Sequence, residues 1–425
     1  MAATQPAKPL PRIEFIALIA AMMALNALAI DVMLPAFPNI GESLGVAVEN
    51  DRQYMLTVYM LGFGVSQLVY GPLSDRFGRR APLLVGIGIY MVAALLTPWS
   101  PSYAGLLALR FIQGIGAAGT RVISQSIVRD TFSGRAMAEI MSLVFMIFML
   151  IPIIAPGIGQ VLLLAGHWSL IFVFMAALGG IIGLWVLFRL PETLRPEDQR
   201  SLRPAVIIDG FRIVFSNRMA MLYAAAGIFI FAALNGYINL AQQIYVDIYG
   251  LGVLFPFAFG AMGIVMAISN FMNSRMVGRI GMRRLSHYAL LGYLFFASVL
   301  LVLSLFGIPP LWLFMTLFAL VMFHFGWIGG NMNALSMEPL GKVAGTASAV
   351  FGFLQTVGGA LIGLGISQSF NGTLVSISGG YALMGALALG CVLLAEKGRL
   401  FGVGAEHRGQ HEAAGDPHDG GPRPE

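Results

Sequence analysis

Composition and hydropathy predict an all-α membrane protein with twelve transmembrane helices. Of the 425 residues, 58% are hydrophobic and only 11% are charged, and the mean hydropathy is +0.81. Soluble domains are roughly 45–50% apolar and about 25% charged, so this chain is too apolar to be one. Its apolar runs are continuous rather than alternating, which favours helices over a β-barrel.

Apolar stretches of roughly 20 residues with few or no charges, the length that a helix needs to cross the hydrocarbon, mark the spans. They lie at residues 15–37, 53–73, 82–99, 103–127, 138–164, 168–190, 219–246, 252–274, 286–307, 311–337, 343–369 and 374–395. The first could instead be a signal peptide, because Lys8 and Arg12 precede it. Its apolar core exceeds the usual length of about 7–15 residues, so we interpret it as a span.

The positive charge is distributed asymmetrically. If the chain starts in the cytoplasm and crosses twelve times, the outer loops hold only Arg52, and the remaining loop and tail Lys and Arg residues lie inside. This asymmetry predicts a multi-pass protein of the inner (plasma) membrane with both termini cytoplasmic. Because the net charge of +5 encodes orientation, we expect no nucleic-acid partner. The single cysteine, Cys391, excludes an intramolecular disulfide and a cysteine-cluster metal site.

The longest polar connector, residues 191–218, divides the chain into two sets of six spans. The predicted parts are a cytoplasmic segment 1–14, an N-terminal bundle 15–190, a cytoplasmic linker 191–218, a C-terminal bundle 219–396 and a disordered tail 397–425. Histidines in this Gly- and Pro-rich tail could bind a metal weakly, although a solvated tail is the simpler interpretation. We expect no metal site and no cofactor.

The two halves repeat a short charged motif. "GPLSDRFGRR" (71–80) follows the second span and "VGRIGMRR" (277–284) follows the eighth. With one inserted residue, Arg76, Gly78, Arg79 and Arg80 align with Arg279, Gly281, Arg283 and Arg284. Parallel halves are typical of transporters that rock two bundles about a central site.

The first copy resembles the signature of the major facilitator superfamily, and the resemblance covers all twelve spans. Its residues here are Gly71, Asp75, Arg76, Gly78, Arg79 and Arg80. The resemblance implies two pseudo-symmetric six-helix bundles, the major facilitator fold, and a gate at this motif. Gly71 would allow close helix approach, and Asp75 would latch one bundle against the other. The alternative is a solvated turn that serves topology alone. The second copy has Gly278 where Asp75 stands, so the latch does not extend to it.

Three further stretches resemble the Bcr/CflA (bicyclomycin/chloramphenicol resistance) family of drug/proton antiporters. "IDVMLPAFP" (30–38) is similar to its first-span motif, and "LRFIQGIGAAGTR" (109–121) and "IPIIAPGIGQ" (151–160) are similar to its fourth- and fifth-span motifs. The matching residues are Arg110, Gln113, Gly114 and Gly116 in the fourth span, and Pro152, Pro156, Gly157 and Gly159 in the fifth. Ala155 and Gln160 depart from the fifth-span pattern, which weakens its support for export.

Asp31 and Arg110 are charges inside predicted spans. A charge at the membrane centre costs at least about 2.5 kcal/mol, and both residues lie roughly 10 Å from the outer surface, so they could pair directly or through water. Arg121 lies eleven residues after Arg110 and therefore on the same helical face. It could line the cavity or extend to the inner surface. Asp31 could also be a helix-end carboxylate exposed to outside water.

Asp31 suits proton coupling because a dry cavity favours its neutral form and a neighbouring Arg110 favours its carboxylate. We therefore assign proton coupling to Asp31 and Arg110. In the second half, polar and aromatic side chains recur at helical spacing in spans seven and ten. The predicted substrate cavity comprises Asn26, Asp31, Arg121, Asn235, Tyr237, Asn239, Gln242, Trp327 and Asn331. The alternative for the amides is hydrogen bonding between packed helices.

Proton-coupled export of small amphipathic, drug-like compounds is the leading functional hypothesis, by rocker-switch alternating access in a functional monomer. The predicted partners are a small-molecule substrate, protons and the lipid bilayer. Proton symport that imports a sugar or organic acid is the alternative. The sequence contains no P-loop, HExxH or GxSxG motif, so we do not expect an enzyme.

Overall fold

The computed structural model describes residues 10–195, 197 and 204–401, and these residues are almost entirely helical. The first half contains α1 (Arg12–Asp31), η1 (Leu34–Ala36), α2 (Phe37–Ser43), η2 (Glu49–Gln53), α3 (Tyr54–Phe77), α4 (Arg80–Leu96), η3 (Thr97–Trp99), α5 (Tyr103–Thr131), α6 (Gly134–Ala165) and α7 (Ser169–Arg189). The second half contains α8 (Pro204–Ser216), α9 (Arg218–Gln242), η5 (Gln243–Ile248), η6 (Gly252–Leu254), α10 (Phe255–Ile280), α11 (Met282–Phe306), α12 (Leu311–Met337), η7 (Glu338–Val343), α13 (Ala344–Gln368) and α14 (Val375–Ala395).

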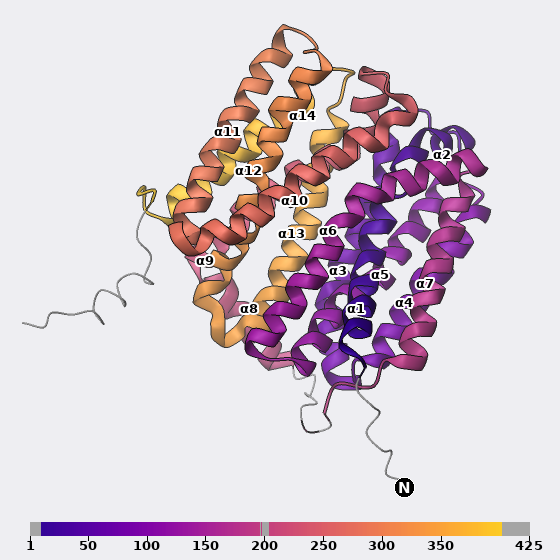
Figure 1. Cartoon of the computed structure of the whole chain (residues 1–425), viewed down its shortest axis with the longest axis vertical. Coiled ribbons are helices and arrows are strands. Elements are labelled where there is room, and N and C mark those ends of the chain that lie inside the picture. Colours follow the sequence, from indigo (N-terminus) through magenta and orange to yellow (C-terminus); the bar gives the residue numbers. More distant parts are fainter. Residues whose placement is uncertain (1–9, 196, 198–203, 402–425) are drawn as a thin grey trace, which may run out of the picture.

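Twelve of the described segments are long and apolar enough to cross a membrane, which confirms the predicted number of spans. The helices form an N-terminal bundle, α1–α7, and a C-terminal bundle, α9–α14. Figure 1 shows the first bundle in indigo to magenta and the second in red to yellow. The bundles meet mainly where α3 packs on α13 and where α6 packs on α10. This arrangement agrees with the predicted pair of six-helix bundles.

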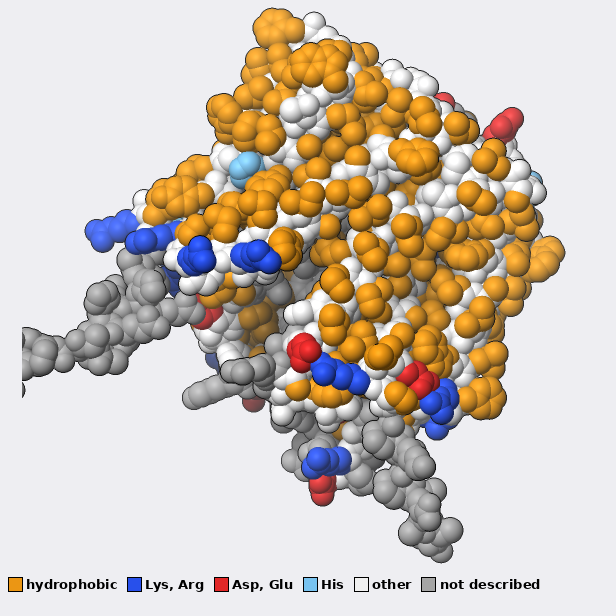
Figure 2. Space-filling model, in the orientation of Figure 1, with side chains coloured by type: hydrophobic (Ala, Val, Ile, Leu, Met, Phe, Trp, Pro, Cys, Tyr) orange, Lys and Arg blue, Asp and Glu red, His pale blue; other side chains and the backbone are white. Residues whose placement is uncertain are grey.

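Apolar side chains cover most of the visible surface, and the visible Lys and Arg side chains lie mainly at its lower edge (Figure 2). We call that edge, where α3 ends and α4 and α11 begin, the basic end of the molecule. The opposite edge, which carries α2, η2 and η5, is the distal end. A broad apolar belt above a charged rim is the surface expected of a protein that spans a bilayer.

Two predicted boundaries differ from the structure. The linker 191–218 contains the helix α8, where only a polar connector was predicted, and α8 packs on α13. The tail was predicted to be disordered from residue 397, but residues 397–401 are placed against α11, with the Phe401 ring 4.4 Å from the Tyr288 ring. The rest of the tail and its histidines lie outside the described residues.

Candidate functional site

Asp31 is the last residue of α1, and only 4% of its surface is exposed. The helix breaks there because Pro35, four residues later, cannot donate a backbone hydrogen bond to it; the span continues through η1 and α2. The carboxyl lies within electrostatic range of Tyr237 in α9. Asp31 is therefore buried at the boundary between the two bundles. Among the described residues, no side chain bonds to it or forms an ion pair with it.

Arg110 is fully buried in α5 and uses its donors elsewhere. One terminal nitrogen donates to Gln113 Oε1 at 2.6 Å and the other to the carbonyl of Ala29 at 3.0 Å, while Nε is 3.4 Å from the carbonyl of Met55. The guanidinium also lies 4.4 Å from the centre of the Tyr59 ring. Arg110 thus connects α5 to α1 and α3.

Of the two possibilities for Asp31 and Arg110, the direct pair is not formed in this structure, and pairing through water stays a prediction. The physical reason is that backbone carbonyls of α1 and α3 and the Gln113 amide satisfy the guanidinium, so the carboxylate is not needed to offset its burial. Because Ala29 lies two residues before Asp31, Arg110 instead holds the backbone of the α1 segment that carries the acid.

Arg121 lies on the same face of α5, about 16 Å nearer the basic end at 1.5 Å per residue. Its guanidinium lies 5.9 Å from the centre of the Phe63 ring in α3. The residue is partly exposed, although its face of α5 is turned toward α1 and α3. No described side chain or carbonyl accepts a hydrogen bond from it. Both interpretations of Arg121, lining the cavity and extending to the inner surface, stay predictions.

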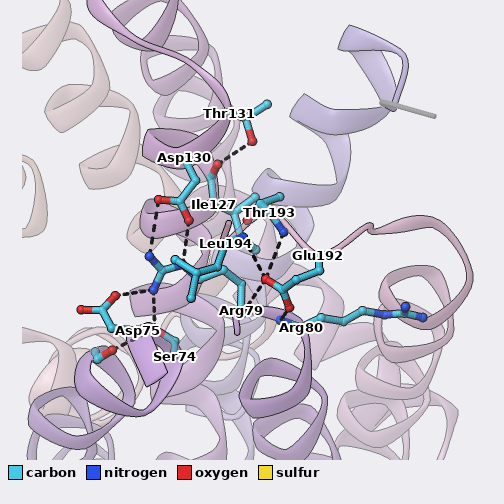
Figure 3. A network of polar contacts seen from close by, with 11 residues as sticks. Ser74, Asp75, Arg79, Arg80, Ile127, Asp130, Thr131, Glu192, Thr193 and Leu194 are labelled. Atoms are coloured by element: carbon cyan, nitrogen blue, oxygen red, sulfur yellow. Dashed lines mark hydrogen bonds and ion pairs between the residues drawn. The ribbon is translucent and has the colours of Figure 1, made fainter. Parts of the chain in front are cut away.

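The charged motif at 71–80 forms a network within the N-terminal bundle (Figure 3). Arg79 donates to Asp75 at 2.5 Å, to Asp130 at 2.7 Å and to Ser74 at 2.9 Å. Burial disfavours the charge on Arg79, but the hydrogen bonds and charges of Asp130 and Asp75 outweigh it and hold its pKa above the usual value. The carboxylate of Glu192, which follows α7, accepts from the backbone N–H groups of Arg79 and Arg80.

Gly78 is required at the turn of this motif. Its φ is +89°, which other residues rarely adopt, and an added Cβ would lie 2.6 Å from the Glu192 carboxylate. The expectation for Gly71 is wrong, because a Cβ there would meet nothing within 4 Å; the helix faces open space at that point. Arg76 is exposed. Asp75 contacts Arg79 and, within the described chain, has no partner in the C-terminal bundle, so the proposed latch is not engaged here.

The fourth- and fifth-span motifs bring helices together. An added Cβ would lie 2.1 Å from the Tyr59 carbonyl oxygen at Gly114 and 2.4 Å from the Tyr90 nitrogen at Gly116, so α5 needs both glycines to pack on α3 and α4. Gly159 likewise lies against the carbonyl of Val32. Pro152 and Pro156 lie inside α6, and Gly157 faces open space. Gly159 thus sets the distance between α6 and the segment after Asp31.

Most predicted polar cavity residues bond within their own bundle. Asn26 accepts from Tyr59, Asn235 donates to the Phe231 carbonyl, Asn239 to Ser367, Gln242 to Asp247, Trp327 to the Ser269 carbonyl, and Asn331 to Asn273. Tyr237 bonds to Tyr245 and stacks on Phe259. The contacts of Asn26, Asn239, Trp327 and Asn331 join packed helices, as in the alternative interpretation, whereas those of Asn235 and Gln242 stay within one span. A substrate role for these residues stays a prediction.

A cluster of neutral amides at the distal end, missed in the sequence, connects the bundles. Gln53 donates to Gln243 at 2.7 Å, and Gln243 donates to Asn50 at 2.9 Å. Asn50 and Gln368 bond to each other's backbone carbonyls at 3.3 and 2.8 Å, and Asn50 also donates to the Phe370 carbonyl. We call these four side chains the distal clasp. A pocket of about 470 Å³ lies beside it, bordered by Glu49 and Asp247. These amides lie singly at the ends of spans, so no sequence period could have revealed them.

The bundles are held less tightly toward the basic end. Near the middle, Gln67 of α3 donates to Thr356 of α13 at 3.1 Å, and Asn270 of α10 contacts the Met149 sulfur of α6 at 3.8 Å. Within the described ranges, no side-chain hydrogen bond or ion pair joins the bundles at the basic end itself. The distal end is closed in this state.

Two bundles of six spans that meet around a buried carboxylate are the arrangement of an alternating-access transporter. The sequence model described as Major Facilitator Superfamily matches residues 19–363. The chain belongs to the Major Facilitator Superfamily. It is therefore a multi-pass membrane transporter with a small-molecule substrate, and its bacterial relatives support a location in the inner membrane.

Named relatives within the superfamily are similar over most of their length. The chain is 30% identical to the "Uncharacterized MFS-type transporter YdgK" of Bacillus subtilis, over 94% of this chain and 98% of that protein. It is also 30% identical to a "Bicyclomycin resistance protein homolog" of Haemophilus influenzae, over 82% and 87%. Among solved structures, a D-xylose-proton symporter matches with a TM-score of 0.71 at 13% identity, over 92% and 99%. The last likeness shows the shared fold.

Proposed function

We propose that this superfamily member exports small amphipathic, drug-like compounds from the cytoplasm in exchange for protons. Both termini and the basic end face the cytoplasm in this proposal, in accord with the positive-inside rule. A relative that covers most of the chain is named for bicyclomycin resistance, and other relatives are named multidrug resistance proteins. These names support efflux as the direction of transport. The protein works as a monomer, since each chain has both bundles.

The observation that carries the proposal is Asp31, which is buried at the boundary between the bundles without a cationic partner. An unpaired carboxylate in an apolar site is strongly disfavoured, so the closed distal end is compatible with a neutral, protonated Asp31. Separation of the bundles at that end would expose the acid to water and to protons from outside. Proton binding and closure of the distal end are then linked, and linkage acts equally in both directions.

Arg110 acts on this acid through the backbone. Its hydrogen bond to the Ala29 carbonyl fixes the end of α1, and its contacts with Gln113 and Tyr59 hold it in place. A movement of α5 that breaks the Ala29 contact would free the guanidinium to attract the carboxylate, which promotes loss of the proton. Arg110 is a positioning residue in the closed state and an electrostatic partner during the cycle.

Substitution of Asp31 tests the coupling. Asp31→Asn keeps the shape of the side chain, so folding and abundance should be unchanged. Wild type and variant are compared in inverted vesicles that contain a pH-sensitive dye, against a panel of amphipathic compounds. We expect substrate-induced proton release by wild type and at least a tenfold loss in the variant. Unimpaired proton-coupled transport by Asp31→Asn would contradict the proposal. Substrate and proton moving in the same direction would instead indicate symport.

A further inference from the structure

Arg121 is a cation inside the membrane for which the described structure provides no anion. It lies in the second half of α5, about 15 Å before the helix ends at Thr131. Its face of α5 is the one from which Arg110 reaches α1 and α3. Arg121 is partly exposed, and helical geometry turns it to the side of α5 that packs on α1 and α3.

The neighbours of Arg121 place it beside the surface where the bundles meet. Phe63 lies under the guanidinium at 5.9 Å. One turn later on α3, Gln67 donates to Thr356 in the C-terminal bundle, and an added Cβ at Gly64 would touch Thr356 and Val357. A molecule between the bundles at this level would meet the Arg121 guanidinium, behind which the buried Phe63 ring lies.

Arginine presents five N–H donors in a planar fork that matches a carboxylate. Buried arginines in proteins are therefore normally paired, and Arg110 illustrates this with three oxygen acceptors from three different residues. Arg121 has no such acceptor among the described residues. A cation inside the membrane without an anion is costly, so this position favours an incoming group that is negatively charged.

We infer that Arg121 binds the carboxylate of an amphipathic, monoanionic substrate. This inference rests on the proposed transport function and specifies the substrate class of that same cavity. Away from its two ends, the described interior of the N-terminal bundle contains three charged side chains, Asp31, Arg110 and Arg121. Since Arg110 is already satisfied, one cation is free, and it balances one negative charge. A phosphate monoester would keep a second charge unpaired.

The proposed carboxylate site at Arg121 and the proposed proton site at Asp31 are separate. Arg110 contacts α1 two residues before Asp31, and Arg121 is about 16 Å from Arg110 along α5. Substrate carboxylate and proton therefore do not compete for the same side chain. Their exchange is coupled through the positions of the bundles, and the bound carboxylate removes the electrostatic cost of Arg121 in the state that opens to the basic end.

The test compares matched ligands on purified full-length protein. The probes are 2-naphthoate, indole-3-acetate and 4-phenylbutyrate, each beside its primary amide, and binding is measured by isothermal titration calorimetry. We expect wild type to bind at least one carboxylate ten times or more tightly than its amide. Arg121→Gln should remove this preference, Arg121→Lys should retain part of it, and Arg121→Glu should prefer 2-naphthylmethylammonium. Arg195→Gln, which changes an exposed arginine in the linker, should behave as wild type.

Equal binding of all carboxylates and amides by wild type, including no binding of either, would overturn the inference. So would a carboxylate preference that survives in Arg121→Gln. If Arg121→Gln does not fold, the inference is still tested by the carboxylate-over-amide preference of wild type and of Arg121→Lys. Failure of the wider proposal gives a different result, because proton release that is the same in wild type and Asp31→Asn would contradict coupling while the Arg121-dependent preference persisted.

Discussion

The two bundles carry matching charged clusters at the basic end. In the first, Arg79 follows a glycine with φ +89° and bonds to Asp130 at the end of the fourth span. In the second, Arg283 follows Gly281, with φ +87°, and pairs with Glu338 at the end of the tenth span. A further acid comes after the last span of each bundle, Glu192 in the first and Glu396 in the second.

The clusters differ in one acid. Asp75 gives Arg79 a second carboxylate from the helix before the turn, whereas Gly278 occupies the matching region of α10. Glu396 instead accepts from the Tyr223 hydroxyl at 2.6 Å as well as pairing with Arg283. The shared contacts tie the helices of each bundle together, so they serve the fold. Asp75 is the unmatched feature, and we attribute a role between bundles to it alone.

The largest expected difference is between the two arginines. Arg79 is 3% exposed, and Arg79→Ala leaves two acids around a vacated site, so unfolding free energy should fall by about 3–5 kcal/mol. Arg283→Ala removes pairs that water already reaches and should cost about 1 kcal/mol. Unfolding by SDS in mixed micelles measures both. Equal losses of unfolding free energy in the two variants would show that the clusters are energetically equivalent and would contradict the predicted difference.

The effects of replacing Gly78 and Gly281 on the unfolding free energy should differ by less than those of replacing the two arginines. Replacing either glycine by Ala forces a side chain into a positive-φ, extended-ψ conformation that is almost confined to glycine, at a cost of about 1–3 kcal/mol. Gly78→Ala also displaces the Glu192 carboxylate from two backbone N–H groups and should cost about 1 kcal/mol more, since at Gly281 a Cβ meets nothing within 4 Å. The same unfolding assay applies. A larger loss for Gly281→Ala would mean that Glu192 is not an important support of the first turn.

Asp75 should have the smallest effect on stability and a large one on transport. Asp75→Asn leaves Asp130 paired with Arg79, so we expect a loss below about 1 kcal/mol, with vesicle transport reduced at least tenfold. Its matched control is Gly278→Asp, which adds an acid to the second cluster and should alter neither quantity appreciably. Normal transport by Asp75→Asn would remove the latch hypothesis and leave both clusters as structural supports.

Sequence patterns predicted the spans and the arginine–glycine motifs because hydropathy and local spacing determine them. The acids that complete the clusters could not be assigned, because Asp130, Glu192, Glu338 and Glu396 are distant in the chain and no local period relates them to the arginines. The similar predicted depth of Asp31 and Arg110 in the membrane suggested that the two residues could pair. The structure differs because backbone carbonyls, which a sequence pattern does not reveal, compete for the guanidinium.

The distal clasp has a consequence for the conditions under which the transporter closes. Gln53, Gln243, Asn50 and Gln368 are all neutral, and their contacts are amide hydrogen bonds. Amides do not titrate between acid and alkaline media, and dissolved ions screen charges far more than they weaken such bonds. The hydrogen bonds of the clasp itself therefore tolerate changes in external salinity and acidity, whereas the proposed proton coupling is assigned to Asp31.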